Sequence, residues 1–303
     1  MLKSLTIIIP YYNGEKFYAK LLKSIKTAIL KLNNKNELKF EIITIIDSIN
    51  TPLNEIREIN NFIFREVDNI DILIHKNDQN IGVAASRNIA LDLSTGEYIH
   101  IIDQDDEVDS SFYLDAFKLL INSDFVLTNG FIIYDGGKYR SHKLYYFSPK
   151  LSTQGILEDD FIRSPGQVVF SKSLLNGIRF PETKNYKGTD DRFFWIKIFV
   201  DNMSIIRPSY VAQPNYVAHI HNSNYSNDLI NMKKSELENW ELFNLDTIPL
   251  GFRRIVNDDI LRIKLTLGEN MTLIDKLRAI RCKINYFLKP NKLLRFILKR
   301  SKC

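Results

Sequence analysis

The sequence has few cysteines and no long hydrophobic run. Of its 303 residues only two are cysteines, Cys282 and Cys303, and both lie near the C-terminus. Two such residues provide neither a disulfide framework nor the paired spacing of a structural metal site, which favours a reducing compartment. The first apolar run, Leu5 to Ile9, stops at Pro10 and is too short for a secretory signal. No segment approaches the roughly 18 apolar residues of a membrane span, so we expect a cytoplasmic protein that is soluble or peripheral.

The charge is unevenly distributed. The whole chain has a formal net charge of +5. Residues 272–303 contain ten lysines and arginines but one acid, Asp275, which gives this segment +9 and leaves −4 for residues 1–271. A mildly acidic body with a basic tail predicts that an anionic surface is the partner of the tail, and it argues against a nucleic-acid-binding body.

Short apolar runs alternate with amphipathic stretches in the first half of the chain. Strands are expected at residues 5–10, 40–47, 71–75 and 97–103, and helices at 16–32, from 51 onward, and at 82–93. This rhythm predicts an α/β fold with a doubly wound, mostly parallel sheet, whose ligands gather at the carboxyl ends of the strands. Further on we expect a helix at 110–121, a strand at 125–134, a hairpin turn at 135–137, a helix at 189–200, an extended segment at 210–221, and helices from about residue 227.

A cluster of carboxylates follows the strand expected at 97–103. The residues are Asp103, Gln104, Asp105 and Asp106, and alternation along an extended chain puts Asp103 and Asp105 on one side. Carboxylates packed this closely repel each other, and a hard divalent cation such as Mg²⁺ or Mn²⁺ relieves the repulsion. A solvated acidic loop that caps the helix beginning near Ser110 is the alternative interpretation.

A second segment combines small residues with an arginine. From Asn80 to Asn88 the chain reads NIGVAASRN, which follows a strand and opens a helix. Small residues allow a ligand to approach the backbone closely, and Arg87 then lies near the strand ends. A plain loop-to-helix junction with a surface arginine would explain the same residues.

Four segments, in order, resemble those of the inverting nucleotide-sugar glycosyltransferases with the A-type fold, glycosyltransferase family 2. They are Thr6–Asn13, Glu41–Asp47, Asn80–Asn88 and Asp103–Asp106, and they span about the first 110 residues. The resemblance implies donor contacts from Pro10, Tyr12, Asn13, Asp47, Asn80, Arg87, Asp103 and Asp105. It also implies a Mn²⁺ or Mg²⁺ ion on Asp105, Asp106 and His221. The family usually has two aspartates after its second strand, whereas this chain keeps Asp47 alone.

The segment Lys187–Trp195 resembles the acceptor side of the family. The resemblance implies that Asp191 is the general base, which takes the proton of the acceptor hydroxyl. Asp190, Trp195 and Gln167 are further acceptor-side candidates. Two structural alternatives remain open: Thr189 with its two acids caps a helix, and Gln167 belongs to a simple turn. His219 and His221 lie on one side of a strand, where a hydrogen-bonded structural histidine is equally expected.

The C-terminal segment predicts a basic amphipathic helix after Thr272. Its apolar positions are Leu277, Ile280, Ile284, Phe287 and Leu288, and its basic positions are Lys276, Arg278, Arg281 and Lys283. A second basic helix is expected at 292–300. Both fit helices that lie on an anionic membrane. A helical hairpin packed on the body with a solvated basic face is the alternative.

These observations predict a glycosyltransferase domain at 1–226, with a nucleotide-sugar half at 1–110 and an acceptor half at 111–226, followed by a helical extension at 227–303. The predicted reaction moves a hexosyl or N-acetylhexosaminyl unit from a UDP-sugar to a hydroxyl of a glycan or lipid-linked acceptor, in bacterial cell-surface polysaccharide synthesis at the inner face of the membrane. A sugar-phosphate nucleotidyltransferase would need a glycine-rich loop after the first strand, where this chain has Tyr11 to Glu15. An inactive nucleotide-sugar-binding module would not need the retained carboxylates.

Overall fold

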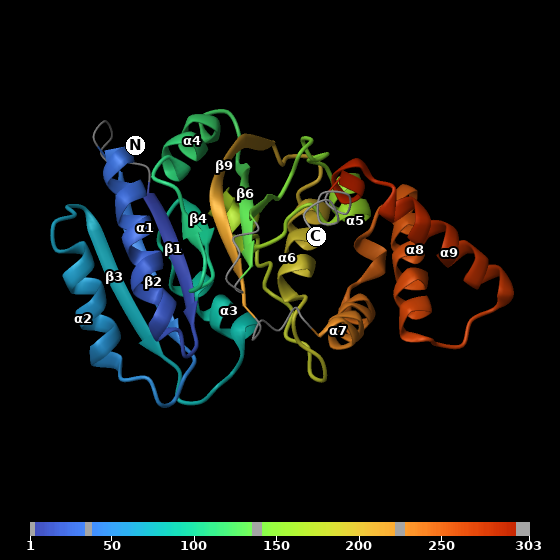
Figure 1. Cartoon of the computed structure of the whole chain (residues 1–303), viewed down its shortest axis with the longest axis horizontal. Helices are drawn as coiled ribbons and strands as arrows, with labels where there is room; N and C mark the ends of the chain where they lie inside the picture. Colours follow the sequence, from blue (N-terminus) through green and yellow to red (C-terminus); the bar gives the residue numbers. More distant parts are fainter. Residues whose placement is uncertain (1–3, 34–37, 135–140, 222–227, 295–303) are drawn as a thin grey trace. The chain divides into compact units, whose positions relative to one another are not determined.

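The structure is a computed structural model that describes residues 4–33, 38–134, 141–221 and 228–294 (Figure 1). The chain divides into two compact units. Residues 1–144, 162–180 and 205–220 form one, here called the sheet unit, and residues 145–161, 181–204 and 221–303 form the other, the helical unit. The hairpin turn expected at 135–137 and most of the second basic helix expected at 292–300 lie outside the described residues.

The sheet unit contains a nine-stranded sheet in the order β3-β2-β1-β4-β8-β6-β9-β5, with β7 paired to β6. Its first four strands pair in parallel: β1 (Ser4–Tyr11), β2 (Lys39–Ile46), β3 (Ile70–Lys76) and β4 (Tyr98–Ile101). The strand order reverses at β1, which confirms the doubly wound α/β fold. The helices between these strands are α1 (Glu15–Asn33), α2 (Leu53–Phe64) and α3 (Val83–Leu93).

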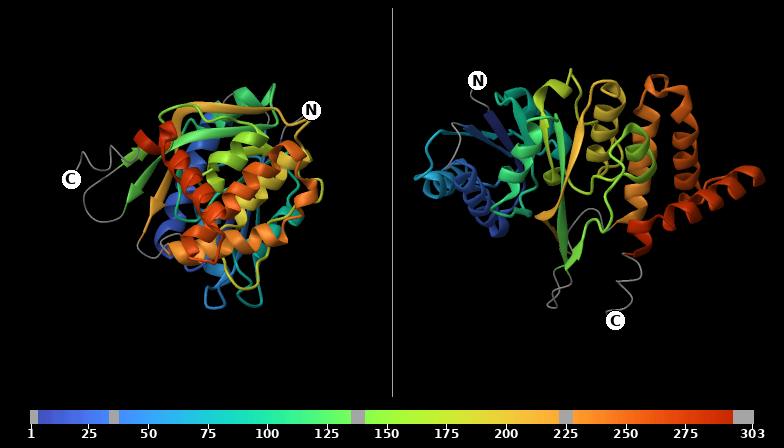
Figure 2. Two further views of the ribbon diagram at one scale, coloured as in Figure 1. Left: turned by 90° about the vertical axis from the view of Figure 1, so that its right-hand side faces the viewer. Right: turned by 90° about the horizontal axis from the view of Figure 1, so that it is seen from above.

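The second part of the sheet is mixed, in contrast to the mostly parallel pairing predicted from the first half of the chain. Its strands are β5 (Glu107–Val108), β6 (Phe125–Tyr134), β7 (Ser141–Lys143), β8 (Val168–Ser171) and β9 (Pro208–Ile220). The long strands β6 and β9 run in parallel side by side (Figure 2). Strand β8 is antiparallel to both β4 and β6. Parallel neighbours need a crossover connection, usually a helix, between consecutive strands. This part of the chain lacks a regular strand–helix–strand alternation, so its strands do not all run in the same direction. The remaining elements of this unit are α4 (Phe112–Leu120) and the short 3₁₀ helices η1 (Pro165–Gln167) and η2 (Lys172–Leu174).

The core of the sheet unit explains why its strands form where they do. Ile7, Ile8 and Ile9 of β1 are completely buried, as expected for a central strand covered on both faces. Right-handed crossovers put α1 and α2 on one face and α3 on the other, because the direction of winding reverses after β3. In agreement, α1 packs against α2 and α4, whereas α3 packs against β1 and β2.

The helical unit contains α5 (Thr153–Asp159), α6 (Asp190–Asp201), α7 (Leu229–Leu242), η4 (Leu245–Thr247), α8 (Leu250–Leu267) and α9 (Leu273–Phe287). Phe193 of α6 packs edge-on against Trp240 of α7, with ring centroids 4.8 Å apart. Helix α6 therefore belongs with the C-terminal helices, and the boundary expected at residue 226 does not coincide with this division of the chain. None of the described helices has the length and apolar character to cross a bilayer.

Candidate active site

Three loops meet at the carboxyl ends of β1, β2 and β4, because β1 is paired in parallel with both neighbours. The loop after β1 is held to the acidic loop by Gln104, whose Oε1 accepts the Tyr12 N–H at 2.8 Å and whose Nε2 donates to the Tyr12 carbonyl at 2.7 Å. It is held to the loop after β2 by Ser48, which donates to Asn13 Oδ1 at 2.6 Å. The Tyr12 side chain is 52% exposed, so it is accessible to a ligand. Pro10 is buried within the strand.

Asp47 shapes the loop that precedes α3. Its Oδ1 accepts Asn77 Nδ2 at 2.8 Å and the Ile81 N–H at 2.9 Å, and its Oδ2 accepts the Gly82 N–H at 2.8 Å. Gly82 has φ = 90°, a conformation that favours glycine. The carboxylate thus anchors the loop that carries the exposed Asn80, while a contact between Asp47 and a nucleoside stays a prediction.

Arg87 is buried rather than exposed on the surface. Its guanidinium donates to Asp103 Oδ1 at 2.6 Å and lies 5.2 Å from the ring centroid of Phe180. The surface-arginine alternative is therefore wrong, since Arg87 is only 5% exposed. Because this pair neutralises one carboxylate of the acidic loop, Arg87 orients Asp103 and limits the repulsion within the cluster.

Asp106 is held inside the sheet unit. It accepts hydrogen bonds from the Tyr216 hydroxyl, from Ser164 Oγ at 3.2 Å and from the His219 N–H at 3.1 Å. Burial raises its pKa well above the ordinary value, and the charges of Asp103 and Asp105 raise it further. Both oxygens of Asp106 accept hydrogen bonds from the chain itself, which positions the loop, and a bond from Asp106 to a metal ion stays a prediction. Asp105 is partly exposed, and its contact with a metal ion is likewise a prediction.

The chemistry of the acidic loop fits a hard divalent cation, because carboxylate oxygens are the preferred ligands of Mg²⁺ and Mn²⁺. Among the residues that the structure describes, no three His, Cys, Asp or Glu side chains are grouped to hold such an ion. His221 is buried and belongs to the helical unit, so its contact with a metal ion stays a prediction. His219 has the structural role that was the open alternative: its Nε2 lies 2.6 Å from Glu107 Oε1, which also pairs with Lys20.

In the helical unit, the predicted base lies in the first turn of α6. Asp191 is partly exposed and accepts the Arg192 N–H at 2.8 Å, whereas Asp190 is buried. Both aspartates lie at the positive end of the helix, a favourable position for acidic side chains. Thr189 occupies the N-cap position without making a side-chain capping bond, and its hydroxyl instead lies 2.9 Å from that of Ser235 on α7.

The next residue, Arg192, belongs to a buried ion network that no sequence motif indicates. Arg192 donates to Asp259 of α8 at 2.6 Å and lies 3.6 Å from Glu236 of α7 and 3.8 Å from Asp160. Trp240 Nε1 also donates to Asp259, at 3.0 Å. The network fixes the start of α6 on two later helices. No local pattern could have revealed it, since Arg192 and Asp259 are 67 positions apart.

Two acceptor-side candidates lie in the interior. Gln167 is completely buried, where its Oε1 accepts the Arg163 N–H at 2.8 Å and its Nε2 donates to the Thr128 carbonyl at 2.9 Å. Trp195 is 1% exposed and packs on Phe194, with ring centroids 4.8 Å apart. Neither side chain offers a surface to an acceptor. The turn alternative for Gln167 is correct, because the residue closes a capping box in η1.

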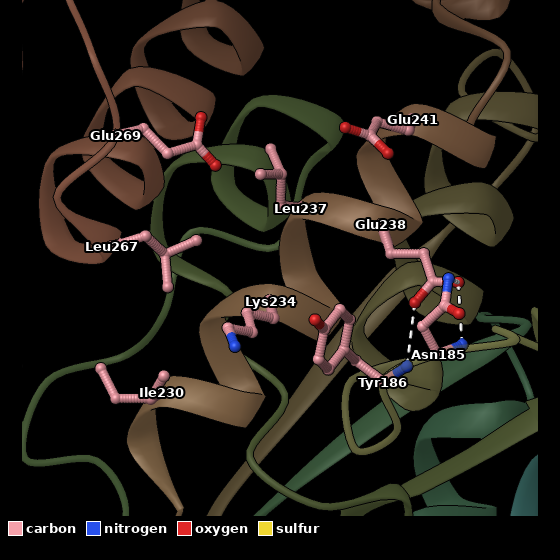
Figure 3. Close-up of a pocket in the computed structure, with 9 residues that line it drawn as sticks. All are labelled: Asn185, Tyr186, Ile230, Lys234, Leu237, Glu238, Glu241, Leu267 and Glu269. Carbon is pink, nitrogen blue, oxygen red and sulfur yellow. Dashed lines mark hydrogen bonds between the residues drawn. The ribbon is translucent and has the colours of Figure 1, made fainter.

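The helical unit contains a cavity of about 570 Å³ (Figure 3). Its lining consists of Asn185, Tyr186, Ile230, Lys234, Leu237, Glu238, Glu241, Leu267 and Glu269. Glu238 forms its wall by accepting the backbone N–H groups of Asn185 and Tyr186 at 3.1 and 3.0 Å. Lys234 Nζ lies 5.1 Å from the centroid of the Tyr186 ring. The cavity combines an aromatic ring with both signs of charge, and no motif of the sequence pointed to the residues that line it.

Comparisons with known proteins agree with this arrangement. Residues 6–179 match the family model of Glycosyl transferase family 2. An uncharacterized glycosyltransferase of Haemophilus influenzae is 26% identical over 190 residues, 63% of this chain and 70% of that protein. Glycosyltransferase GlyA of Streptococcus pneumoniae is 28% identical over 117 residues, 39% of this chain and 15% of that protein.

Solved structures share the fold at low sequence identity. The S. aureus TarS 1–349 structure in complex with UDP-GlcNAc matches with a TM-score of 0.62 and 18% identity, over 94% of this chain and 80% of that one. The mannosyltransferase PcManGT from Pyrobaculum calidifontis, in complex with GDP-Man and Mn²⁺, matches with a TM-score of 0.60 and 14% identity, over 100% of this chain and 80% of that one.

Proposed function

Because the chain belongs to glycosyl transferase family 2, we propose that it transfers a hexosyl or N-acetylhexosaminyl unit from a nucleotide-diphosphate sugar to a hydroxyl group with inversion. The observation that carries this proposal is the joining of the loops after β1, β2 and β4, through Gln104 and Ser48, into one site at the edge of the sheet. Ligands of such sheets bind at this edge.

The proposed donor is a UDP-sugar. Support comes from the TarS neighbour, which binds UDP-GlcNAc, although PcManGT binds GDP-Man. In this proposal Tyr12, Asn13 and Asn80 contact the nucleotide from the exposed loops, and Asp47 anchors the loop that carries Asn80. Asp105 would hold Mn²⁺ or Mg²⁺, and such an ion supplies charge stabilisation to the departing diphosphate. Arg87 holds Asp103, and Tyr216 holds Asp106, so that the acidic loop is preorganised.

The acceptor is proposed to be a glycan or a lipid-linked saccharide. Asp191 takes the proton of the attacking hydroxyl, which a carboxylate at a helix start can do while Arg192 keeps that helix fixed. The cavity beside Tyr186 has the size and mixed polarity of a ligand pocket, which supports binding of the saccharide part there. The proposed setting is bacterial cell-surface polysaccharide synthesis at the inner face of the cytoplasmic membrane, with residues 272–303 as the segment that contacts anionic lipid.

A screen of nucleotide-sugars with Mn²⁺ or Mg²⁺ tests the proposal, because slow hydrolysis of the donor requires no acceptor. We expect turnover of a UDP-sugar that stops when EDTA removes the metal ion. Turnover that continues in EDTA would exclude the metal-dependent mechanism. Formation of a nucleotide-sugar from a sugar phosphate and a nucleoside triphosphate would instead identify a nucleotidyltransferase, and binding without turnover would identify an inactive module.

A further inference from the structure

Helix α9 presents its apolar side to solvent. Leu273, Leu277, Ile280, Ile284 and Phe287 are spaced alternately four and three residues apart, so they share one face of the helix. Their side chains are 73%, 60%, 45%, 54% and 57% exposed, in that order. Single exposed apolar residues are ordinary, but a contiguous stripe of five marks an interaction surface. Here this stripe is called the outer face of α9.

The opposite side of α9 packs on α8. Ala279 is its buried position, and Asp275, Cys282 and Tyr286 share that face by the same spacing. Arg278, beside them, donates to Asp258 of α8 at 2.5 Å, and the Arg262 guanidinium lies 4.0 Å from the Tyr286 ring. The outer face starts at Leu273 and the packing face at Asp275, two residues later, which is a rotation of about 200° around the helix axis. The two faces therefore lie on opposite sides of α9. Helix α9 is thus attached through small and polar side chains and directs its apolar side away from its partner, the reverse of an ordinary core-facing helix.

The outer face is bordered by basic residues. Lys276 and Lys283 lie along one edge and Arg281 along the other, and the helix has one acid, Asp275, on its packing side. Among the described residues, the ion pairs of this segment involve other cations, such as Arg278 with Asp258 and Lys292 with Asp159. An apolar stripe between basic edges matches the acyl region and the phosphate groups of an anionic lipid leaflet.

A groove at the edge of the outer face adds to this match. It has a volume of about 450 Å³ and is lined by Leu265, Ile280, Lys283, Ile284, Phe287 and Leu288. Five of these six residues are apolar, and Lys283 is the exception. The apolar lining suits a lipid acyl chain, and Lys283 is a cation at the same groove for the phosphate group of that lipid.

We infer that the outer face of α9 lies in the interfacial layer of an anionic bilayer, with the helix axis parallel to the membrane plane. The inference specifies the contact surface of the peripheral membrane location proposed above and rests on that proposal. A second copy of the chain is a poorer occupant, because two outer faces in contact would bring Lys276, Arg281 and Lys283 of both copies together. Anionic headgroups instead neutralise these residues.

Cosedimentation with vesicles of phosphatidylcholine and phosphatidylglycerol tests the inference. We expect the full chain to bind these vesicles and to bind pure phosphatidylcholine weakly. Ile280→Glu with Ile284→Glu should reduce binding at least about tenfold, since the apolar stripe supplies the burial. The matched control is Ile121→Glu with Ile205→Glu, which changes two other exposed isoleucines and the same amount of charge. The vesicle affinity of this control should stay within about twofold of that of the unchanged protein. A further variant, Lys276→Glu with Lys283→Glu, should weaken binding to anionic vesicles because it reverses the charge along one edge of the outer face.

Each other result has a distinct meaning. Equal binding by the α9 variant and its control would overturn the assigned face while leaving the membrane location intact. No binding by the unchanged chain would overturn both. A dimer in solution that Ile280→Glu with Ile284→Glu dissociates, without vesicle binding, would assign the face to a second copy. Donor hydrolysis without vesicles should be the same in all variants as in the unchanged protein. If the unchanged protein does not hydrolyse a donor, that result would count against the proposed enzyme function and not against the assigned membrane face.

Discussion

The sheet unit and the helical unit arrange their functional side chains by different means. In the sheet unit, Asp47 and the acidic loop directly follow strands, and the parallel pairing of β1 with β2 and β4 is sufficient to gather them. In the helical unit, Asp191 begins a helix whose position depends on Arg192 and its partners on α7 and α8. A site at strand ends thus follows from local order in the chain, whereas a site on a helix bundle depends on distant buried pairs.

Of the variants that test this difference between the two units, Asp191→Asn should have the largest effect on activity. The substitution removes the proton acceptor that we propose and leaves the residues proposed for the donor unchanged. We expect kcat to fall by about 10²–10⁴, with donor affinity unchanged. Steady-state kinetics and a UDP-binding titration measure the two quantities. A loss of donor binding, or an unchanged rate, would move the search for the base to Asp190.

The next effect concerns stability. Arg192→Leu leaves Asp259, Glu236 and Asp160 without their shared cation in a buried position, which costs about 3–5 kcal/mol. The matched control is Arg179→Leu in the sheet unit, which breaks an ion pair with the exposed Asp92 and should cost about 0–1 kcal/mol. Denaturant unfolding measures both. Similar losses would show that the helical unit does not depend on its buried pairs.

A smaller effect on the stability of the helical unit is expected when the pH is lowered. Burial acts to raise the pKa of Asp259, but the guanidiniums of Arg192 and Arg262 outweigh it and hold that pKa below the ordinary value of 3.8. The unfolded chain therefore binds this proton more tightly than the folded chain does. The contribution of Asp259 to stability is complete above its ordinary pKa and is lost as the pH falls below 3.8. Thermal unfolding across this range should show a shallower acid dependence in Asp259→Asn, and an equal slope would contradict the account.

The smallest effect is expected from substitutions in the loops of the sheet unit, which should change the KM for the donor. Gln104→Ala removes the two bonds that hold the loop after β1 to the acidic loop, so the donor KM should rise about tenfold while kcat changes little. Gly14→Ala should act in the same direction, because a Cβ at position 14 would overlap the Gln104 amide. A fall in kcat with an unchanged KM would mean that Gln104 serves the chemistry and not the shape of the donor site.

Much of the sheet unit could be predicted from local pattern. Residues expected in a helix at 82–93 form α3 at Val83–Leu93, and the strand expected at 125–134 is β6. Apolar periodicity reports secondary structure directly, because it records which face of an element is buried. The pattern failed for Gln167 and Trp195, which looked available to an acceptor but are buried. Gln167 is held in the interior by a hydrogen bond to the Thr128 carbonyl, 39 positions away in the chain, which no spacing in its own segment encodes.

By itself the sequence determined the order of the elements, the family, the acidic loop after β4 and the amphipathic character of α9. These properties depend on residues that are neighbours in the chain or lie one helical turn apart. Only the tertiary structure decided that Arg87 is buried against Asp103, that Arg192 pairs with Asp259, and that α9 packs through its polar side. Burial is a property of the whole packed chain, because partners far apart in sequence remove a side chain from water. For α9 the amphipathic pattern specified that two faces exist, and the packing on α8 decided which one remains exposed.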